Sequence, residues 1–326
     1  DNMRCFDLNT GEELWNYAYD APGTVRFSGT RSVPAIDGDY VYSCGHNGDL
    51  YCLDINTHQP VWNKNIWTDF GGGEIPRWAI VQCPLVYADL VILASQTSEA
   101  GVVAYDKLSG EVEWTTDSLG PLGYVSPAIV KVDKEDHVVM ITASSGRGEN
   151  QSGGKVVGMD PISGKILWEY TNWQCIIPAP SAYDAGDGKV LIVGGYEAGA
   201  AMIQVEKQVD GRYGVTELYK NVEFGAHTKP PLHYEGHFYA QYSTNRRRDG
   251  IVCMRMDGEL MWKTGREPAF NKGSMILAEG LIFATDGDKT LYLIEPDPSG
   301  FKALASADVL KIVEVAEPRY GNQNWA

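Results

Sequence analysis

A short cassette that recurs along the chain constrains its fold more than any other feature. The first copy, Cys5 to Trp15, contains an Asp, a Thr-Gly pair four residues before its end and a closing Trp, and most later copies repeat these residues. The later copies end, in chain order, at Trp62, Trp114, Trp168, Tyr219, Trp262 and Leu304. Repetition of one unit along a chain predicts a repeat architecture.

The spacing of the copies identifies the kind of repeat. Successive end points are 47, 52, 54, 51, 43 and 42 residues apart, and periods of about 40 to 50 residues are typical of propeller blades. Each unit contains short β-branched runs separated by turn residues such as Asn47-Gly48, the pattern of β-hairpins. Because no segment sustains a helical period, we predict an all-β chain of four-stranded antiparallel blades.

The cassette has a physical rationale in such a fold. A large flat indole at a fixed outer-strand position can fill the wedge between neighbouring blades. The Gly allows close approach or a positive φ, and the Asp can accept backbone N–H groups of the turn. The first position is Cys, Ala or Gly in the five clear copies, which indicates a tight packing site.

The pattern Ala-x-Asp-x-x-Thr-Gly-x-x-x-Trp is the tryptophan-docking motif of pyrroloquinoline-quinone-like (PQQ-like, quinoprotein-type) propellers, and the chain resembles that superfamily from end to end. It resembles exported bacterial PQQ-like repeat proteins and, more distantly, the propeller lipoprotein of the outer-membrane assembly machinery. The resemblance implies eight blades and a periplasmic or outer-membrane-associated location. The chain shows seven period marks, begins at the third strand of a unit, and ends with Asn322–Ala326, which resembles the start of another. The sequence is consistent with either seven or eight blades, and we prefer an eight-bladed ring with incomplete terminal blades.

Composition agrees with one propeller domain over residues 1–326. The net charge of −16 argues against a nucleic-acid partner, because binding phosphates needs local positive charge. No apolar run approaches the roughly 18 residues that a membrane helix needs. The chain shows no signal peptide, but its first residue falls inside a repeat, which is consistent with removal of a leader. Cys5, Cys52 and Cys253 share one cassette position, so we expect packing roles rather than disulfides.

Enzyme chemistry has weak support in the residues. The quinoprotein dehydrogenases of the superfamily that the chain resembles hold a quinone over a calcium ion beside a vicinal Cys-Cys pair. This chain has no adjacent cysteines. The acidic run Asp133–Asp136 is interpreted as a solvated turn, and the spacing of His227, His233 and His237 does not place three ligands on one face. We therefore assign no catalytic residue, no metal site and no cofactor, with PQQ and calcium as the alternative.

A better candidate is the mouth of the channel, because the segment before each first strand should reach the axis. The positive and aromatic residues expected there are Arg31, Arg77, Trp78, Tyr124, Trp173, His227, Lys229 and Lys272. Aromatic planes and Arg forks suit an anionic or saccharide ligand. The alternative is that these residues pack or pair with nearby acids. A basic triplet, Arg246–Arg248, is interpreted as a solvated loop.

The sequence thus favours a non-enzymatic exported propeller that binds or scaffolds a protein or saccharide partner. A PQQ- and calcium-dependent dehydrogenase is the alternative. A polysaccharide lyase or hydrolase that uses Tyr, His and Arg residues at the mouth is a weaker one, since loop residues leave no fixed spacing.

Overall fold

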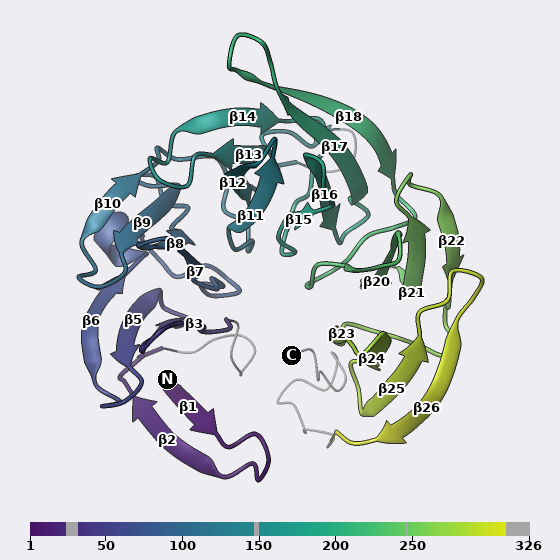
Figure 1. Cartoon of the computed structure of the whole chain (residues 1–326), viewed down its shortest axis with the longest axis horizontal. Coiled ribbons are helices and arrows are strands. Elements are labelled where there is room, and N and C mark those ends of the chain that lie inside the picture. The colour runs from purple at the N-terminus through teal and green to yellow at the C-terminus, as the bar shows by residue number, and fades with distance from the viewer. Residues whose placement is uncertain (24–31, 147–149, 245–246, 311–326) are drawn as a thin grey trace.

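The computed structural model describes residues 1–23, 32–146, 150–244 and 247–310. In these ranges the strands form six four-stranded sheets and one two-stranded sheet, and every neighbouring pair of strands is antiparallel. Figure 1 shows the sheets arranged one after another around a central axis, as the blades of a propeller. The predicted all-β propeller is confirmed.

Each four-stranded sheet starts with an inner strand near the axis and ends with an outer strand at the rim (Figure 1). The first three are β3 (Ala35–Asp37), β4 (Tyr40–Cys44), β5 (Asp49–Asp54) and β6 (Pro60–Asn65); β7 (Leu85–Tyr87), β8 (Leu90–Ala94), β9 (Val102–Asp106) and β10 (Val112–Thr115); and β11 (Ala128–Val132), β12 (Glu135–Ile141), β13 (Val156–Met159) and β14 (Ile166–Tyr170). A short 3₁₀ helix, η1 (Thr68–Phe70), follows β6.

The next three sheets repeat this order. They are β15 (Tyr183–Asp184), β16 (Lys189–Gly194), β17 (Gly199–Lys207) and β18 (Tyr213–Asn221); β19 (Leu232–Tyr234), β20 (His237–Ser243), β21 (Arg248–Arg255) and β22 (Leu260–Lys263); and β23 (Met275–Ala278), β24 (Leu281–Thr285), β25 (Thr290–Glu295) and β26 (Lys302–Asp308). In the described part of the chain, no helix has the length and apolar character to cross a membrane.

The two-stranded sheet consists of β1 (Asn2–Phe6) and β2 (Glu13–Ala18), which carry the first cassette. In the four-stranded sheets the cassette spans the third and fourth strands, so β1 and β2 correspond to the third and fourth strands of those sheets. The pairing also explains the small residue that opens the cassette, since Cys52, Ala104 and Gly158 each lie directly opposite the Trp of their own sheet.

The closing Trp of one sheet packs against the cassette turn of the next. A Cβ added to Gly164 would lie 2.4 Å from the ring of Trp114, and one added to Gly110 would lie 2.7 Å from the ring of Trp62. The indole N–H of Trp62 also donates to the backbone carbonyl of Lys107, at 3.0 Å. Trp62 and Trp114 are each 8% exposed. Only a residue without a side chain leaves room for the indole at these turns.

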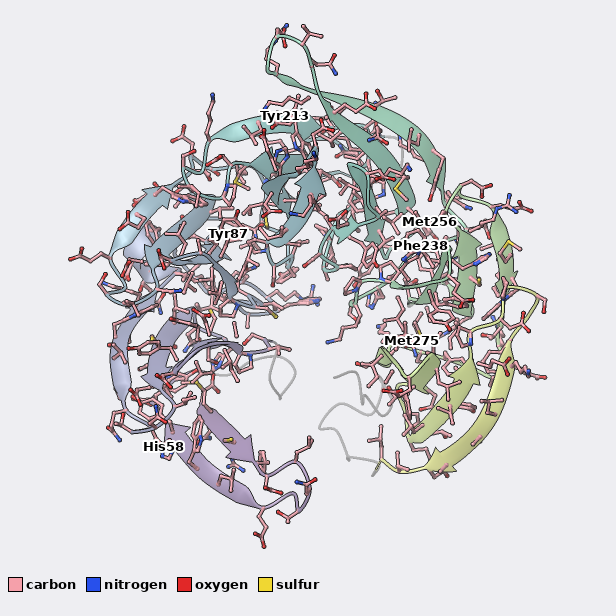
Figure 2. The ribbon with its side chains drawn as sticks, in the orientation of Figure 1. His58, Tyr87, Tyr213, Phe238, Met256 and Met275 are labelled. Atoms are coloured by element: carbon pink, nitrogen blue, oxygen red, sulfur yellow. The ribbon has the colours of Figure 1, made fainter. Side chains whose placement is uncertain are left out.

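In the first four cassettes an Asp holds the turn in place. Asp106 Oδ1 accepts the backbone N–H groups of Leu108 and Ser109, and these bonds lower the pKa of its carboxyl group. The Gly at the end of the turn has a positive φ, +71° at Gly110. In the second cassette His58 takes this place with φ +59°, and Trp15 stacks on its ring with a centroid distance of 5.1 Å (His58 is labelled in Figure 2).

Burial of the closing residues is not uniform. Trp168 is 4% exposed, but Trp15 and Trp262 are only half-buried, so these two indoles fill the wedge between blades less completely than predicted. Both belong to junctions with the first and last sheets of the described chain, where fewer neighbouring atoms cover the ring. In one degenerate copy, Tyr219 replaces the Trp and packs against Gly258.

The docking contact predicts a difference between two glycines with the same backbone conformation. Gly164→Ala should reduce the free energy of unfolding by about 1–3 kcal/mol more than Gly11→Ala, because overpacking against Trp114 adds to the backbone strain. Gly11 is the matched control, since its φ is +73° against +69° for Gly164 and no atom lies within 4 Å of its added Cβ. Urea denaturation measures both variants, and equal losses would contradict the docking role.

Candidate ligand site at the mouth of the ring

The topology brings two sets of loops to one end of the ring. Successive strands in a sheet are antiparallel, so the hairpin between its second and third strands lies at the same end as the connection to the next sheet. This end is called the mouth here. Figure 2 shows nitrogen-tipped side chains from several sheets reaching into the central opening.

Three predicted residues meet at the mouth on the side of β7 and β11. The guanidinium carbon of Arg77 lies 4.5 Å from the ring centroid of Trp78, within cation–π distance. The Trp78 ring in turn lies 6.4 Å from that of Tyr124. Arg77 is exposed and the two aromatic rings are half-buried, so this group presents a cation beside an aromatic surface.

A second group lies on the side of β16 and β19. Tyr196, in the hairpin between β16 and β17, contacts the ring of His227 with a centroid distance of 5.0 Å. Burial raises the pKa of Tyr196, and the positive charge of Arg77 acts against that rise. Arg77 therefore acts electrostatically on both Tyr124 and Tyr196, which links the two groups.

A third set of residues extends the site from His227 toward β23. Burial, followed by the charge of Lys272, lowers the pKa of His227 to about 3, so the imidazole is neutral at pH 7. Burial, followed by the charge of Arg248, lowers the pKa of Lys272 to about 8. Arg248 donates to the side-chain oxygen of Asn271 at 2.7 Å. We call Arg77, Trp78, Tyr124, Tyr196, His227 and Lys272 the mouth cluster.

Not every predicted residue belongs to this cluster. Trp173 is 3% exposed and packs in the core with Cys175, because the backbone of Gly194 approaches both side chains closely. A ligand at the mouth therefore cannot stack on it. Lys229 is exposed on the connection before β19, and Arg31 lies outside the described residues.

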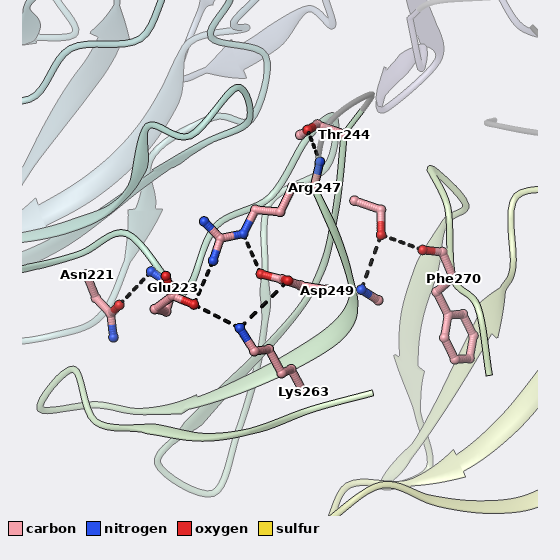
Figure 3. A network of polar contacts seen from close by, with 9 residues as sticks. Asn221, Glu223, Thr244, Arg247, Asp249, Lys263 and Phe270 are labelled. Carbon is pink, nitrogen blue, oxygen red and sulfur yellow. Dashed lines mark hydrogen bonds and ion pairs between the residues drawn. The ribbon is translucent and has the colours of Figure 1, made fainter. Parts of the chain in front are cut away.

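The basic triplet also differs from its prediction as a solvated loop. Arg247 is only 17% exposed and bridges two carboxylates, Glu223 at 2.8 Å and Asp249, while Lys263 also contacts both (Figure 3). Its guanidinium lies 4.6 Å from the centroid of the Tyr242 ring. Arg247 is thus part of an internal polar network, whereas Arg248 is exposed and Arg246 lies outside the described residues.

Sequence reasoning missed Tyr196. It occupies a turn with Glu197 in which both residues have positive φ, +53° and +70°, a pattern that usually requires Asn-Gly. The signal in the sequence was an aromatic residue directly after Gly194-Gly195, at the hairpin position where the second unit has a His-Asn-Gly turn.

The acidic run at the opposite end is exposed at Asp133, Lys134 and Glu135, as interpreted, and two of its carboxylates also form ion pairs. Glu135 binds Lys207 and the hydroxyl of Tyr213, and Asp136 binds Lys131 at 2.5 Å. These contacts line an open rim groove of about 500 Å³, beside the labelled Tyr87 and Tyr213 of Figure 2. The carboxylates tie the turn before β12 to the hairpin between β17 and β18.

The mouth cluster does not fit a calcium ion. Calcium takes roughly six to eight oxygen ligands, largely carboxylates and carbonyls. Of the six residues of the mouth cluster, Arg77 and Lys272 are cations and none carries a carboxylate. The described ranges also contain no group of three or more His, Cys, Asp or Glu residues arranged to hold a metal. All six cysteines are free thiols.

The difference between the neighbours Arg247 and Arg248 is testable. Arg247→Ala should lower the free energy of unfolding by about 1–3 kcal/mol, because it leaves two partly buried carboxylates with Lys263 as their remaining cation. Arg248→Ala, the matched control at an exposed position, should cost less than about 0.5 kcal/mol. Denaturant midpoints compare the two variants, and equal midpoints would place Arg247 outside the network.

The buried imidazole predicts a pH dependence of stability. The folded pKa of His227, about 3, is below its ordinary value of 6.5, so below pH 6.5 the unfolded chain binds a proton that the folded chain does not. Its contribution is complete above pH 6.5 and is lost as the pH falls toward 3. Denaturation at pH 7 and pH 5 should show a loss in the wild type that exceeds the loss in His227→Gln by about 1 kcal/mol or more. Equal losses would show that His227 titrates normally.

The fold, with its indole-on-glycine contacts, defines a PQQ-like β-propeller. A protein-family sequence model described as outer membrane protein assembly factor BamB matches residues 1–175, more than half of the chain. The chain belongs to this family.

Curated relatives fall into two groups. The chain is 28% identical over 142 residues to the BamB of Kangiella koreensis, which covers 42% of this chain and 32% of that protein. It is 26% identical over 162 residues to a quinoprotein ethanol dehydrogenase of Pseudomonas putida, which covers 47% of this chain and 24% of that enzyme. The alignments thus span about a third or less of these relatives.

Solved structures show the same two groups. BamB from Moraxella catarrhalis matches with a TM-score of 0.58 at 17% identity, over 91% of this chain and 78% of that one. A europium-containing methanol dehydrogenase matches with a TM-score of 0.60 at 13% identity, over 94% of this chain and 75% of that one. At these identities the similarity supports the fold alone.

Proposed function

We propose that this chain is a non-enzymatic binding protein that scaffolds a protein partner during outer-membrane protein assembly. The observation that carries the proposal is the composition of the mouth cluster, in which a cation beside aromatic rings faces outward. Aromatic and Arg side chains are enriched in protein–protein interfaces. The matched family is described as an outer membrane protein assembly factor. We therefore propose outer-membrane protein assembly as the process, and a periplasmic or outer-membrane-associated location.

The second candidate is a quinone-dependent dehydrogenase, which the relatives named for alcohol oxidation keep open. Two observations weigh against it. The chain contains no adjacent cysteine pair, and the mouth cluster offers cations where a calcium-held quinone would need carboxylates. The matched proteins are named for protein assembly or for alcohol oxidation, and these names do not support a saccharide partner.

The scaffold role predicts a defect in the bacterium that encodes the chain. Depletion should lower the amount of folded outer-membrane β-barrel proteins, because assembly would lose a binding platform, and expression of the wild-type chain should restore it. Heat-modifiable mobility of barrel proteins on gels measures the folded fraction. Unchanged barrel assembly after complete depletion would contradict the proposal.

A parallel assay tests the second candidate. The purified chain, incubated with PQQ and calcium, should reduce no redox dye in the presence of methanol or ethanol. Dye reduction that requires both additives and the alcohol would establish the dehydrogenase instead.

A further inference from the structure

We infer that the mouth cluster binds the carboxylate groups of an extended acidic peptide segment, and that Arg77 holds one of these carboxylates. This inference rests on the proposed function, because it names the part of a protein partner that the mouth would take. Three features of the described residues support it. They are the exposed guanidinium of Arg77 without an ion pair, the aromatic surface beside it, and the strained turn at Tyr196.

Arg77 is an exposed cation that forms no ion pair with another described residue. Lys229 and Arg248, at the same end, are also exposed and form no ion pair with a described residue. This state contrasts with that of Arg247, whose charge is matched inside the chain by Glu223 and Asp249. The planar guanidinium of Arg77 is held 4.5 Å from the Trp78 ring centroid. A guanidinium that is positioned by stacking retains N–H groups that can bind a carboxylate in a bidentate geometry.

The aromatic residues explain why we assign a peptide rather than a free anion. Trp78 and Tyr124 form a half-buried pair beside Arg77, and the charge of Arg77 also acts on Tyr196 in the second group. Such rings pack against the aliphatic and planar parts of a peptide while the cation takes its acidic group. A small inorganic anion would use the cation and leave these surfaces uncovered.

The turn at Tyr196 is the third feature. Tyr196 and Glu197 both have positive φ, and the turn is closed by a 3.0 Å hydrogen bond from the Ala198 N–H to the Gly195 carbonyl. Bulky residues rarely adopt this conformation, and such strain is concentrated at binding sites. Here the conformation places the Tyr196 ring against His227, whose ring lies close to the backbone of Gly195. The strained turn therefore supplies an aromatic side chain to the mouth.

The experiment measures fluorescence anisotropy of a fluorescein-labelled peptide of alternating Glu and Ala residues, with a Gln-for-Glu peptide of the same length as its neutral match. The wild-type chain should bind the Glu peptide and not the Gln peptide. Arg77→Gln should weaken binding roughly tenfold, as expected for loss of one charge-assisted contact. Lys165→Gln is the matched control, because Lys165 is exposed in the turn before β14, at the end opposite the mouth. Unfolding midpoints verify that both variants are folded.

Three results would overturn the inference: no binding of the Glu peptide, equal binding of both peptides, or equal weakening by the two substitutions. A competition arm separates carboxylate from phosphate recognition. Malonate should displace the peptide at least as well as inorganic phosphate at equal concentration, and displacement by phosphate alone would overturn the carboxylate assignment.

The outcomes also separate this inference from the proposed function. Normal barrel assembly in cells that carry Arg77→Gln, together with a defect in depleted cells, would remove the mouth from the function and leave the scaffold role intact. Peptide binding at the mouth without any depletion defect would retain the site and remove the assembly role.

Discussion

The contact between an indole and the glycine turn of the next sheet is the interaction on which the ring depends. A single twisted four-stranded sheet exposes two apolar faces, and a neighbouring sheet must cover each of them. Trp62 and Trp114 reach across these junctions to Gly110 and Gly164, where an added Cβ would overlap the ring. The same contact sets the spacing between sheets, and so it decides where the connections between sheets end at the mouth.

The junction after β14 shows what happens when the next cassette is degenerate. The hairpin between β17 and β18 has no Ser-Gly turn, and the indole of Trp168 instead lies over Gly158 of its own sheet and donates to His137 Nδ1 at 3.0 Å. A hydrogen bond and an ion pair connect the β11–β14 sheet to the β15–β18 sheet. The Tyr170 hydroxyl donates to Glu217 at 2.6 Å, and Lys207 pairs with Glu135. Hydrogen bonds and ion pairs at this junction take over the role that the docked indole has elsewhere.

The parts of the fold that depend on local spacing were predictable from the sequence. The Asp-to-Trp interval determines a hairpin, and the small residue opposite the Trp follows from the pairing of the third and fourth strands. Burial of Trp173, pairing of Arg247 and the position of Tyr196 were not predictable. Each of these depends on which connections meet after the ring has curved, and segments from different sheets meet there without any fixed separation in sequence.

The mouth also differs from the rest of the molecule in charge. A chain of net charge −16 does not attract acidic partners as a whole, and at physiological ionic strength the fields of its exposed groups, Arg77 included, are screened within about 8 Å. Attraction to the mouth therefore acts only on a segment that is already close to it. An acidic segment would reach the mouth after other surfaces of its protein had docked on the ring, and this order of events suits a scaffold that holds a large partner better than a receptor for a freely diffusing anion.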